Sequence, residues 1–165
     1  MLALQHSVDA VVGGTPEQVW AVVSDPTRHP ALAGSGEVLA LRVVTDGPVR
    51  VGTEFEADED IKFGPSRQKF TARSKVVEFD APRVMSWTST PPGKPTPRRI
   101  QWWFRLTPDA AGTRVVHRIE VDMGPVGNVL LTPIYRVMRA RTIRDGMRGT
   151  LENLDKAVRE GPGAA

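Results

Sequence analysis

Residues 112–123 read GTRVVHRIEVDM, and apolar and polar side chains alternate along this stretch. Successive side chains of a β-strand point to opposite faces, so Val115, Ile119 and Val121 share one face with His117. The other face carries mainly arginine and acidic residues. The pattern predicts a strand with one buried side, on which His117 is the single strongly polar group.

The composition limits the class of protein. The chain has 165 residues and a net charge of +3, which fits a single domain over residues 1–160 and a disordered tail at 161–165. It contains no cysteine, so disulfide bridges, thiolate zinc sites and cysteine nucleophiles are excluded. No apolar run reaches the ~18 residues of a membrane span and no signal-peptide pattern opens the chain, which favours a cytoplasmic protein.

Turns rich in glycine and proline divide the remaining sequence into short elements. Residues 4–12 predict a strand, and Thr15, Pro16 and Gln18 predict a capped helix that ends before Pro26. Further strands are predicted at about 37–45, 51–61, 67–79, 83–90, 98–107 and 113–123.

Two oppositely charged runs indicate how two of these strands pair. EFEADED at 54–60 and RQKFTARSK at 67–75 each gather their charges on one face. A hairpin about Phe63-Gly64 predicts the pairs Asp60–Arg67, Asp58–Lys69, Glu54–Arg73, Phe55–Ala72 and Ala57–Phe70. Opposite charges that face each other across strands contribute ~0.2–1 kcal/mol each. The basic run is then a neutralised surface, and it gives no support to a nucleic-acid partner.

The C-terminal region predicts one long helix from Thr132, its N-cap, to about Arg159. A helical wheel gives it an apolar stripe toward the sheet, formed by Pro133, Val137, Ala140, Ile143, Met147, Leu151, Leu154 and Val158. Gly146 and Gly149 indicate close backbone packing in the middle of the helix, or a space left beneath it.

Five segments in this order resemble a known superfamily: 15–26 (TPEQVWAVVSDP), 51–55 (VGTEF), 76–87 (VVEFDAPRVMSW), 104–118 (FRLTPDAAGTRVVHR) and 151–160 (LENLDKAVRE). The sequence is similar to START-like, Bet v 1-like proteins, in the SRPBCC branch called polyketide cyclase/dehydrase-like. The resemblance implies an α+β helix-grip fold. In that fold a curved antiparallel sheet of about seven strands wraps a long C-terminal helix, two short helices follow the first strand, and a cavity remains inside. Such proteins include cyclases and carriers of lipids or hormones, so the resemblance leaves the activity open.

Within that fold, the inward positions of the sheet and helix are candidate ligand contacts. We expect the cavity to be lined by Phe55, Phe70, Ser74, Met85, Trp87, Trp102, Phe104, His117, Arg136, Arg144 and Met147. Apolar walls with a few polar groups are the usual make-up of a small-molecule site. The last hairpin sets Phe104 opposite His117, and Trp103 opposite Arg118 on the outer face.

Two titratable residues are candidates for proton transfer. His117 has an ordinary pKa near neutrality and can serve as a hydrogen-bonding group or a proton carrier. It can equally be a core histidine satisfied by a neighbouring hydroxyl or carbonyl. Glu59 faces inward by parity and would suit an acid/base partner for His117, but its place near the hairpin end favours a rim position in contact with solvent.

The first half of the long helix is rich in arginine. Arg136 and Arg144 flank the apolar stripe. They can fix an anionic ligand group, draw the protein to acidic lipid headgroups, or form a solvated face.

Three functions remain open. The first is a carrier or sensor of a lipid-like or polyketide-like molecule. The second is a polyketide cyclase or dehydratase in which His117, alone or together with Glu59, moves protons. The third is an interaction module, such as a homodimer, that uses Trp103 and the arginine-rich helix. No nucleotide, phosphate or nucleic-acid motif and no metal-ligand spacing occurs, so we predict no cofactor, no metal and no nucleic-acid partner.

Overall fold

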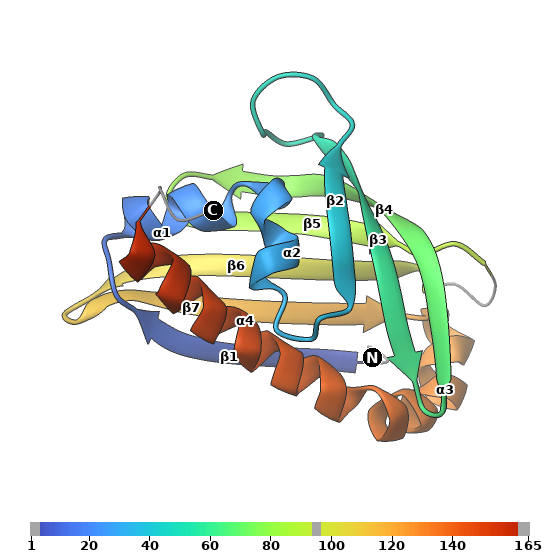
Figure 1. Cartoon of the computed structure of the whole chain (residues 1–165). Helices are drawn as coiled ribbons and strands as arrows, with labels where there is room; N and C mark the ends of the chain where they lie inside the picture. The colour runs from blue at the N-terminus through green and yellow to red at the C-terminus, as the bar shows by residue number, and fades with distance from the viewer. Residues whose placement is uncertain (1–3, 94–96, 162–165) are drawn as a thin grey trace.

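The computed structural model describes residues 4–93 and 97–161, and it has the helix-grip fold (Figure 1). A seven-stranded antiparallel sheet has the spatial order β1-β7-β6-β5-β4-β3-β2. Its strands are β1 (Leu4–Val12), β2 (Val38–Val43), β3 (Glu54–Phe63), β4 (Ser66–Asp80), β5 (Val84–Thr90), β6 (Arg99–Asp109) and β7 (Gly112–Asp122). Of the predicted tail, residues 162–165 lie outside the described part.

Two short helices and a 3-10 turn follow the first strand. Helix α1 (Pro16–Val23) begins with the predicted capping box, in which Thr15 and Gln18 exchange side-chain to backbone hydrogen bonds of 2.9 and 3.3 Å. A 3-10 turn (Pro26–Arg28) then leads into α2 (His29–Leu32). The buried faces of α1 and α2 join the inner side of the sheet in one hydrophobic core, which fills one end of the fold.

The charged hairpin is present, but its predicted register is wrong by two residues. Asp60 pairs with Lys69, Phe55 with Ser74 and Ala57 with Ala72. The turn is the two-residue connection Gly64-Pro65, with Gly64 at a φ of +58°. Because the shift is an even number of residues, every side chain keeps its predicted face. Arg67 still reaches Asp60 along a diagonal, at 2.9 Å.

A long C-terminal helix is present, but its predicted start at Thr132 and its continuity are wrong. The chain instead forms α3 (Gly124–Met138) and α4 (Ala140–Glu160), which meet at Arg139. Thr132 is not an N-cap: it is buried inside α3, where its hydroxyl donates to the carbonyl of Asn128. Val137 is 84% exposed and does not face the sheet.

Helix α4 does carry the predicted apolar stripe. Ile143, Met147, Leu151 and Leu154 are all buried, and α4 crosses the open side of the curved sheet (Figure 1). None of the described helices combines the length and the apolar character needed to cross a bilayer.

The two glycines of α4 allow a close backbone contact. A Cβ atom placed on Gly34 would lie 2.5 Å from the Gly146 carbonyl oxygen and 2.5 Å from the Gly149 Cα. The loop after α2 is therefore seated directly on α4. Its neighbour Ser35 borders the cavity described below.

Candidate functional site

An internal cavity of about 740 Å³ lies between the inner face of the sheet and helix α4. The sheet supplies most of its wall, through inward side chains of β3 to β7. Helix α4 supplies Ile143, Gly146 and Met147, and α3 supplies Leu131, Ile134 and Tyr135. The cavity therefore lies where the inner face of the curved sheet meets helices α3 and α4 and the loop after α2.

Aromatic rings on three neighbouring strands form one wall of the cavity. Trp87 on β5 stacks with Trp102 on β6, with ring centroids 6.4 Å apart and planes at 14°. Trp102 also lies 5.4 Å from the His117 ring of β7, at 20°. These near-parallel planes give the cavity a flat wall that suits a ring-containing or extended apolar ligand.

His117 is part of this wall and is 4% exposed. Its Nδ1 lies 3.0 Å from the carbonyl oxygen of Trp103. A carbonyl only accepts, so Nδ1 carries the proton and Nε2 of the neutral ring is an acceptor. Burial lowers the His117 pKa to about 4, against the raising effect of the Trp103 carbonyl. The group is a neutral imidazole at neutral pH.

A second imidazole, His29 of α2, lies close to the same rings. Its ring centroid is 5.0 Å from that of Trp87 and 6.1 Å from that of Phe104. Its Nε2 lies 2.9 Å from the Val23 carbonyl, and burial lowers its pKa. No sequence pattern indicates the position of His29, because a short irregular segment between prolines has no periodicity that would assign its side chains to a face.

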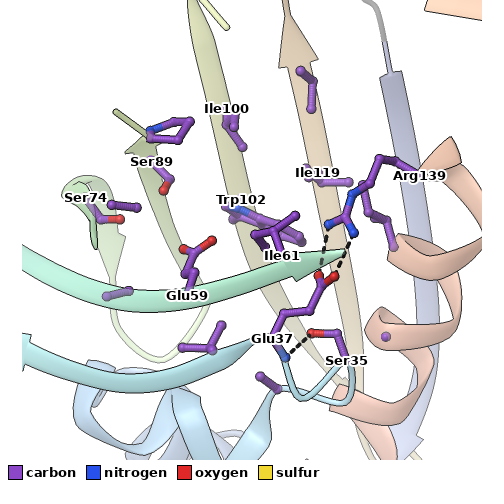
Figure 2. Close-up of a pocket in the computed structure, with 18 of the residues that line it drawn as sticks. Ser35, Glu37, Glu59, Ile61, Ser74, Ser89, Ile100, Trp102, Ile119 and Arg139 are labelled. Atoms are coloured by element: carbon purple, nitrogen blue, oxygen red, sulfur yellow. Dashed lines mark hydrogen bonds and ion pairs between the residues drawn. The ribbon is translucent and has the colours of Figure 1, made fainter. Parts of the chain in front are cut away.

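A buried ion pair forms the polar border of the cavity. Arg139 Nη1 and Nη2 donate to the two carboxylate oxygens of Glu37 at 2.7 and 2.9 Å, and Nη1 also donates to the Lys62 carbonyl at 2.6 Å. The Glu37 carboxylate also accepts from the Lys62 N–H at 3.0 Å. The pair joins the α3–α4 junction to β3 and to the loop before β2 (Figure 2).

Glu59 points into the cavity beside this pair, in the region of Ser74 and Ser89 (Figure 2). Burial, and after it the nearby Glu37, raise its pKa to about 7, against the lowering effect of Arg139. The side chain keeps an intermediate exposure to solvent, as a position near the rim predicts, although the loop before β2 packs along this end of β3. Three strands separate β3 from β7, and no direct hydrogen bond joins Glu59 to His117.

Most of the predicted ligand contacts line the cavity. The cavity wall contains Phe55, Phe70, Ser74, Trp87, Trp102, Phe104, His117 and Met147. Met85 does not line it, because it is fully buried in the core at the closed end. Arg136 and Arg144 do not line it either. Both lie at a surface hollow beside the start of β1.

Outside the cavity, Trp103 lies on the outer face of the sheet, where the Arg118 guanidinium sits 5.6 Å from its ring centroid. Among the described residues, no group of three or more histidine or acidic side chains is placed to hold a metal ion. What the cavity offers chemically is an apolar volume, two neutral imidazoles and a carboxyl group that titrates near neutrality.

Solved structures with this fold cover almost the whole chain. The di-domain aromatase/cyclase StfQ of the steffimycin biosynthetic pathway matches with a TM-score of 0.70 and 14% identity, over 94% of this chain and 50% of that one. The major latex-like protein 151 of Panax ginseng matches with a TM-score of 0.67 and 8% identity, over 93% of this chain and 95% of that one.

A protein of Mesorhizobium loti matches with a TM-score of 0.63 and 15% identity, over 93% of this chain and 98% of that one. At these identities the likeness shows the fold alone. No curated protein sequence matches the chain. The family model described as polyketide cyclase / dehydrase and lipid transport matches residues 3–159. Since that match spans nearly the full sequence, the chain belongs to the polyketide cyclase/dehydrase and lipid transport family.

Proposed function

We propose that this protein binds a hydrophobic small molecule in its internal cavity and acts as a carrier or sensor of that molecule. The observation that carries the proposal is the cavity of about 740 Å³ with its stacked aromatic wall. Drug-sized ligands occupy clefts of ~300–1,000 Å³, so the volume is adequate for a polycyclic or lipid-like ligand.

The polar groups of the wall favour an uncharged ligand at the aromatic end. His117 and His29 both have lowered pKa values, so neither supplies a cation that would pair with a carboxylate. With Nδ1 of His117 held by the Trp103 carbonyl, Nε2 can accept a hydrogen bond from a ligand hydroxyl or N–H. A hydrophobic molecule that carries one such donor fits this end of the cavity.

Native mass spectrometry of freshly purified protein tests the proposal directly. We expect an adduct whose mass corresponds to an organic molecule, and denaturation should release it. Nile red, an uncharged fluorescent probe, then measures the cavity after the adduct has been removed. A probe that binds at the aromatic wall should also quench the tryptophan fluorescence.

A cavity-filling variant provides the specific control. Ala57 is buried on β3 and lines the cavity, so Ala57→Phe should weaken nile red binding by at least about tenfold. Ala110 is exposed in the β6–β7 turn, and Ala110→Phe should leave binding unchanged. Equal binding by both variants, with no adduct in the parent protein, would contradict the proposal.

A second candidate, favoured by Glu59, is a cyclase or dehydratase. A carboxyl group with a pKa of about 7 inside a cavity can both take and return a proton at neutral pH. For a poly-carbonyl substrate, a base removes an α-proton, the resulting enolate carbon attacks a ketone carbon, and an acid protonates the alkoxide that forms. The base then removes a second α-proton while the acid protonates the departing hydroxyl, which forms a C=C bond and releases water. His117 Nε2 and Glu59 can serve opposite ends of such a substrate, but they cannot exchange a proton directly.

Kinetics on a short synthetic poly-β-keto thioester separate the two functions. If proton transfer is the role of His117, His117→Ala should abolish turnover with little change in affinity, and Glu59→Gln should lower kcat. If the protein is a carrier, the parent protein shows no turnover and His117→Ala shows only weaker binding.

A further inference from the structure

Helix α3 buries a polar stripe and exposes a large apolar one. Its buried residues are Gly124, Asn128 and Thr132, each four positions after the last. Its outward side chains are large and apolar, with exposed fractions of 71% for Val126, 64% for Val129, 65% for Leu130, 46% for Ile134 and 84% for Val137. Residues 124–135 contain no charged side chain. Contiguous exposed apolar surface of this kind marks an interaction site.

The polar side chains on the inner face of α3 have hydrogen-bond partners, so the fold itself determines that the apolar side chains of α3 point outward. Asn128 donates to the Asp122 carboxylate at 2.8 Å and accepts from the Met123 N–H at 2.7 Å. The Thr132 hydroxyl donates to the Asn128 carbonyl. Rotating α3 to bury its apolar side would break these hydrogen bonds. It would also turn outward a face without charged side chains, which a solvent-exposed helix face normally carries.

A basic hollow adjoins the C-terminal end of this apolar face. It is formed by Leu4, Gln5, His6, Ser7, Arg136, Ala140 and Arg144. Arg136 and Arg144 are exposed and form no ion pair with any described residue. The Nε2 atom of His6 is buried and has no hydrogen-bond partner. Burial, Arg144 and Arg136 all lower the pKa of His6, which shows that the positive potential of both guanidinium groups reaches into the hollow.

We propose that α3 and this basic hollow form one surface that docks on an anionic lipid bilayer. The apolar side chains of α3 would enter the boundary between headgroups and acyl chains, and Arg136 and Arg144 would hold a lipid phosphate. Leu131, Ile134 and Tyr135 of the same helix line the cavity. Docking therefore sets the cavity wall against the bilayer, where an apolar molecule can pass between the two without crossing water.

The charge distribution favours a bilayer over a second copy of the chain. A symmetric dimer through α3 would bring two sets of Arg136 and Arg144 onto the same buried surface, with no acidic partner for them among the described residues of the hollow. An anionic membrane supplies the complementary charge and an apolar layer together. The inference concerns the outer surface and does not depend on a ligand occupying the cavity.

Flotation with vesicles tests this surface on the ligand-free protein. We expect the parent protein to float with vesicles of phosphatidylcholine and phosphatidylglycerol and to partition at least about tenfold less onto pure phosphatidylcholine. Raising the salt concentration should weaken the binding, because exposed charges are screened. Equal partitioning onto both kinds of vesicle, or onto neither, would overturn the proposal.

Two variants separate the apolar and the charged contributions. Leu130→Asp should abolish flotation, whereas Arg136→Glu with Arg144→Glu should remove the preference for phosphatidylglycerol. The matched controls are Leu39→Asp, at an apolar residue that is 56% exposed on β2, and Arg105→Glu with Lys156→Glu, which make the same charge change elsewhere. Both controls should float like the parent protein. A concentration-dependent dimer that Leu130→Asp dissociates would assign the face to a second copy and contradict the proposal.

The absence of cysteine permits a direct measure of insertion. A single cysteine at Val129, labelled with an environment-sensitive nitrobenzoxadiazole group, should gain and blue-shift its fluorescence on anionic vesicles. The same label at Leu39 should not respond. A silent label at Val129 during flotation would show that α3 stays in water and would overturn the assignment.

Discussion

His117 and Phe104 stack face to face across β7 and β6, with ring centroids 4.3 Å apart and planes at 13°. Phe104 thereby covers one face of the imidazole with an apolar ring, while the Trp103 carbonyl holds Nδ1. A charged imidazolium is poorly solvated in such a place, and its pKa falls to about 4. His117 therefore acts as an oriented, neutral hydrogen-bonding group.

The first prediction concerns the acid stability of the fold. An unfolded histidine binds its proton near pH 6.5 and folded His117 near pH 4, so the unfolded state binds more protons between these values. The stability due to this difference is complete above pH 6.5 and is lost as the pH falls toward 4. The shift corresponds to about 3 kcal/mol in the free energy of unfolding. Urea unfolding at a series of pH values measures it.

The variant His117→Phe keeps a flat apolar side chain and removes the titration. Its free energy of unfolding should fall less steeply between pH 6.5 and 4 than that of the parent protein. His29, whose pKa is also lowered, keeps part of the slope in both proteins. An imidazole resonance of His117 that titrates near pH 6.5 in NMR spectra would contradict the prediction.

The second prediction has the opposite pH dependence. Glu59 binds its proton near pH 7 in the folded protein and near 4.5 when unfolded, so the folded state binds more protons between these values. The neutral carboxyl is tolerated at low pH, and stability is lost as the pH rises from 4.5 through 7. Glu59→Gln should therefore be about 1–3 kcal/mol more stable than the parent protein at pH 8, and close to it at pH 4.5.

Glu54 on the same strand provides the matched control. Its carboxylate is exposed and lies 3.4 Å from the Lys75 ammonium, so Glu54→Gln should change stability by less than about 1 kcal/mol at either pH. Thermal melts at pH 4.5 and 8 give the comparison. A loss of stability in Glu59→Gln at pH 8 would show that the carboxylate is favourably paired.

The third prediction concerns the buried pair of Glu37 and Arg139, whose side chains are 12% and 8% exposed. Removing one partner leaves the other charge buried, so Arg139→Met should destabilise the fold by about 3–5 kcal/mol. The double variant Glu37→Leu with Arg139→Met should recover part of that loss. Arg42→Met breaks the exposed pair with Glu56 and should cost less than about 1 kcal/mol.

The same pair also shifts the pKa of Glu59, in addition to the larger effect of burial. Glu37 raises the Glu59 pKa and Arg139 lowers it, so Glu37→Gln should lower this pKa and Arg139→Gln should raise it. Carboxyl-carbon NMR of the two variants measures both directions. Shifts of the same sign in both variants would show that the substitutions act through altered burial and not through charge.

Alternation predicted the sheet well because its period of two residues is set by the backbone. The inward positions of Phe55, Trp87, Phe104 and His117 all follow from it. The pairing of Phe104 with His117 follows instead from the turn between β6 and β7, which was placed correctly. The hairpin register was missed because it depends on where the turn lies. Gly64-Pro65 closes the hairpin one residue later than predicted, which shifts the pairing by two residues, and charge pairing tolerates either register.

The C-terminal region was harder to predict because tertiary contacts override local signals there. Thr132-Pro133 has the composition of a helix start. In the structure the helix already begins at Gly124, buries Asn128 and Thr132, and continues through Pro133. The burial of Arg139 depends on Glu37, 102 residues away in sequence, so no local pattern indicates it.

The last prediction tests the contact that brings the loop after α2 onto α4. A Cβ on Gly34 would meet backbone atoms of both Gly146 and Gly149 at 2.5 Å. Backbone cannot move aside as a flexible side chain can, so Gly34→Ala should destabilise the protein by about 1–3 kcal/mol. Gly13→Ala is the control, since its Cβ would meet only the end of the Arg159 side chain, at 3.2 Å. If α4 yields instead, Gly34→Ala will be as stable as Gly13→Ala and will bind nile red differently, because Ser35 and Gly146 both border the cavity.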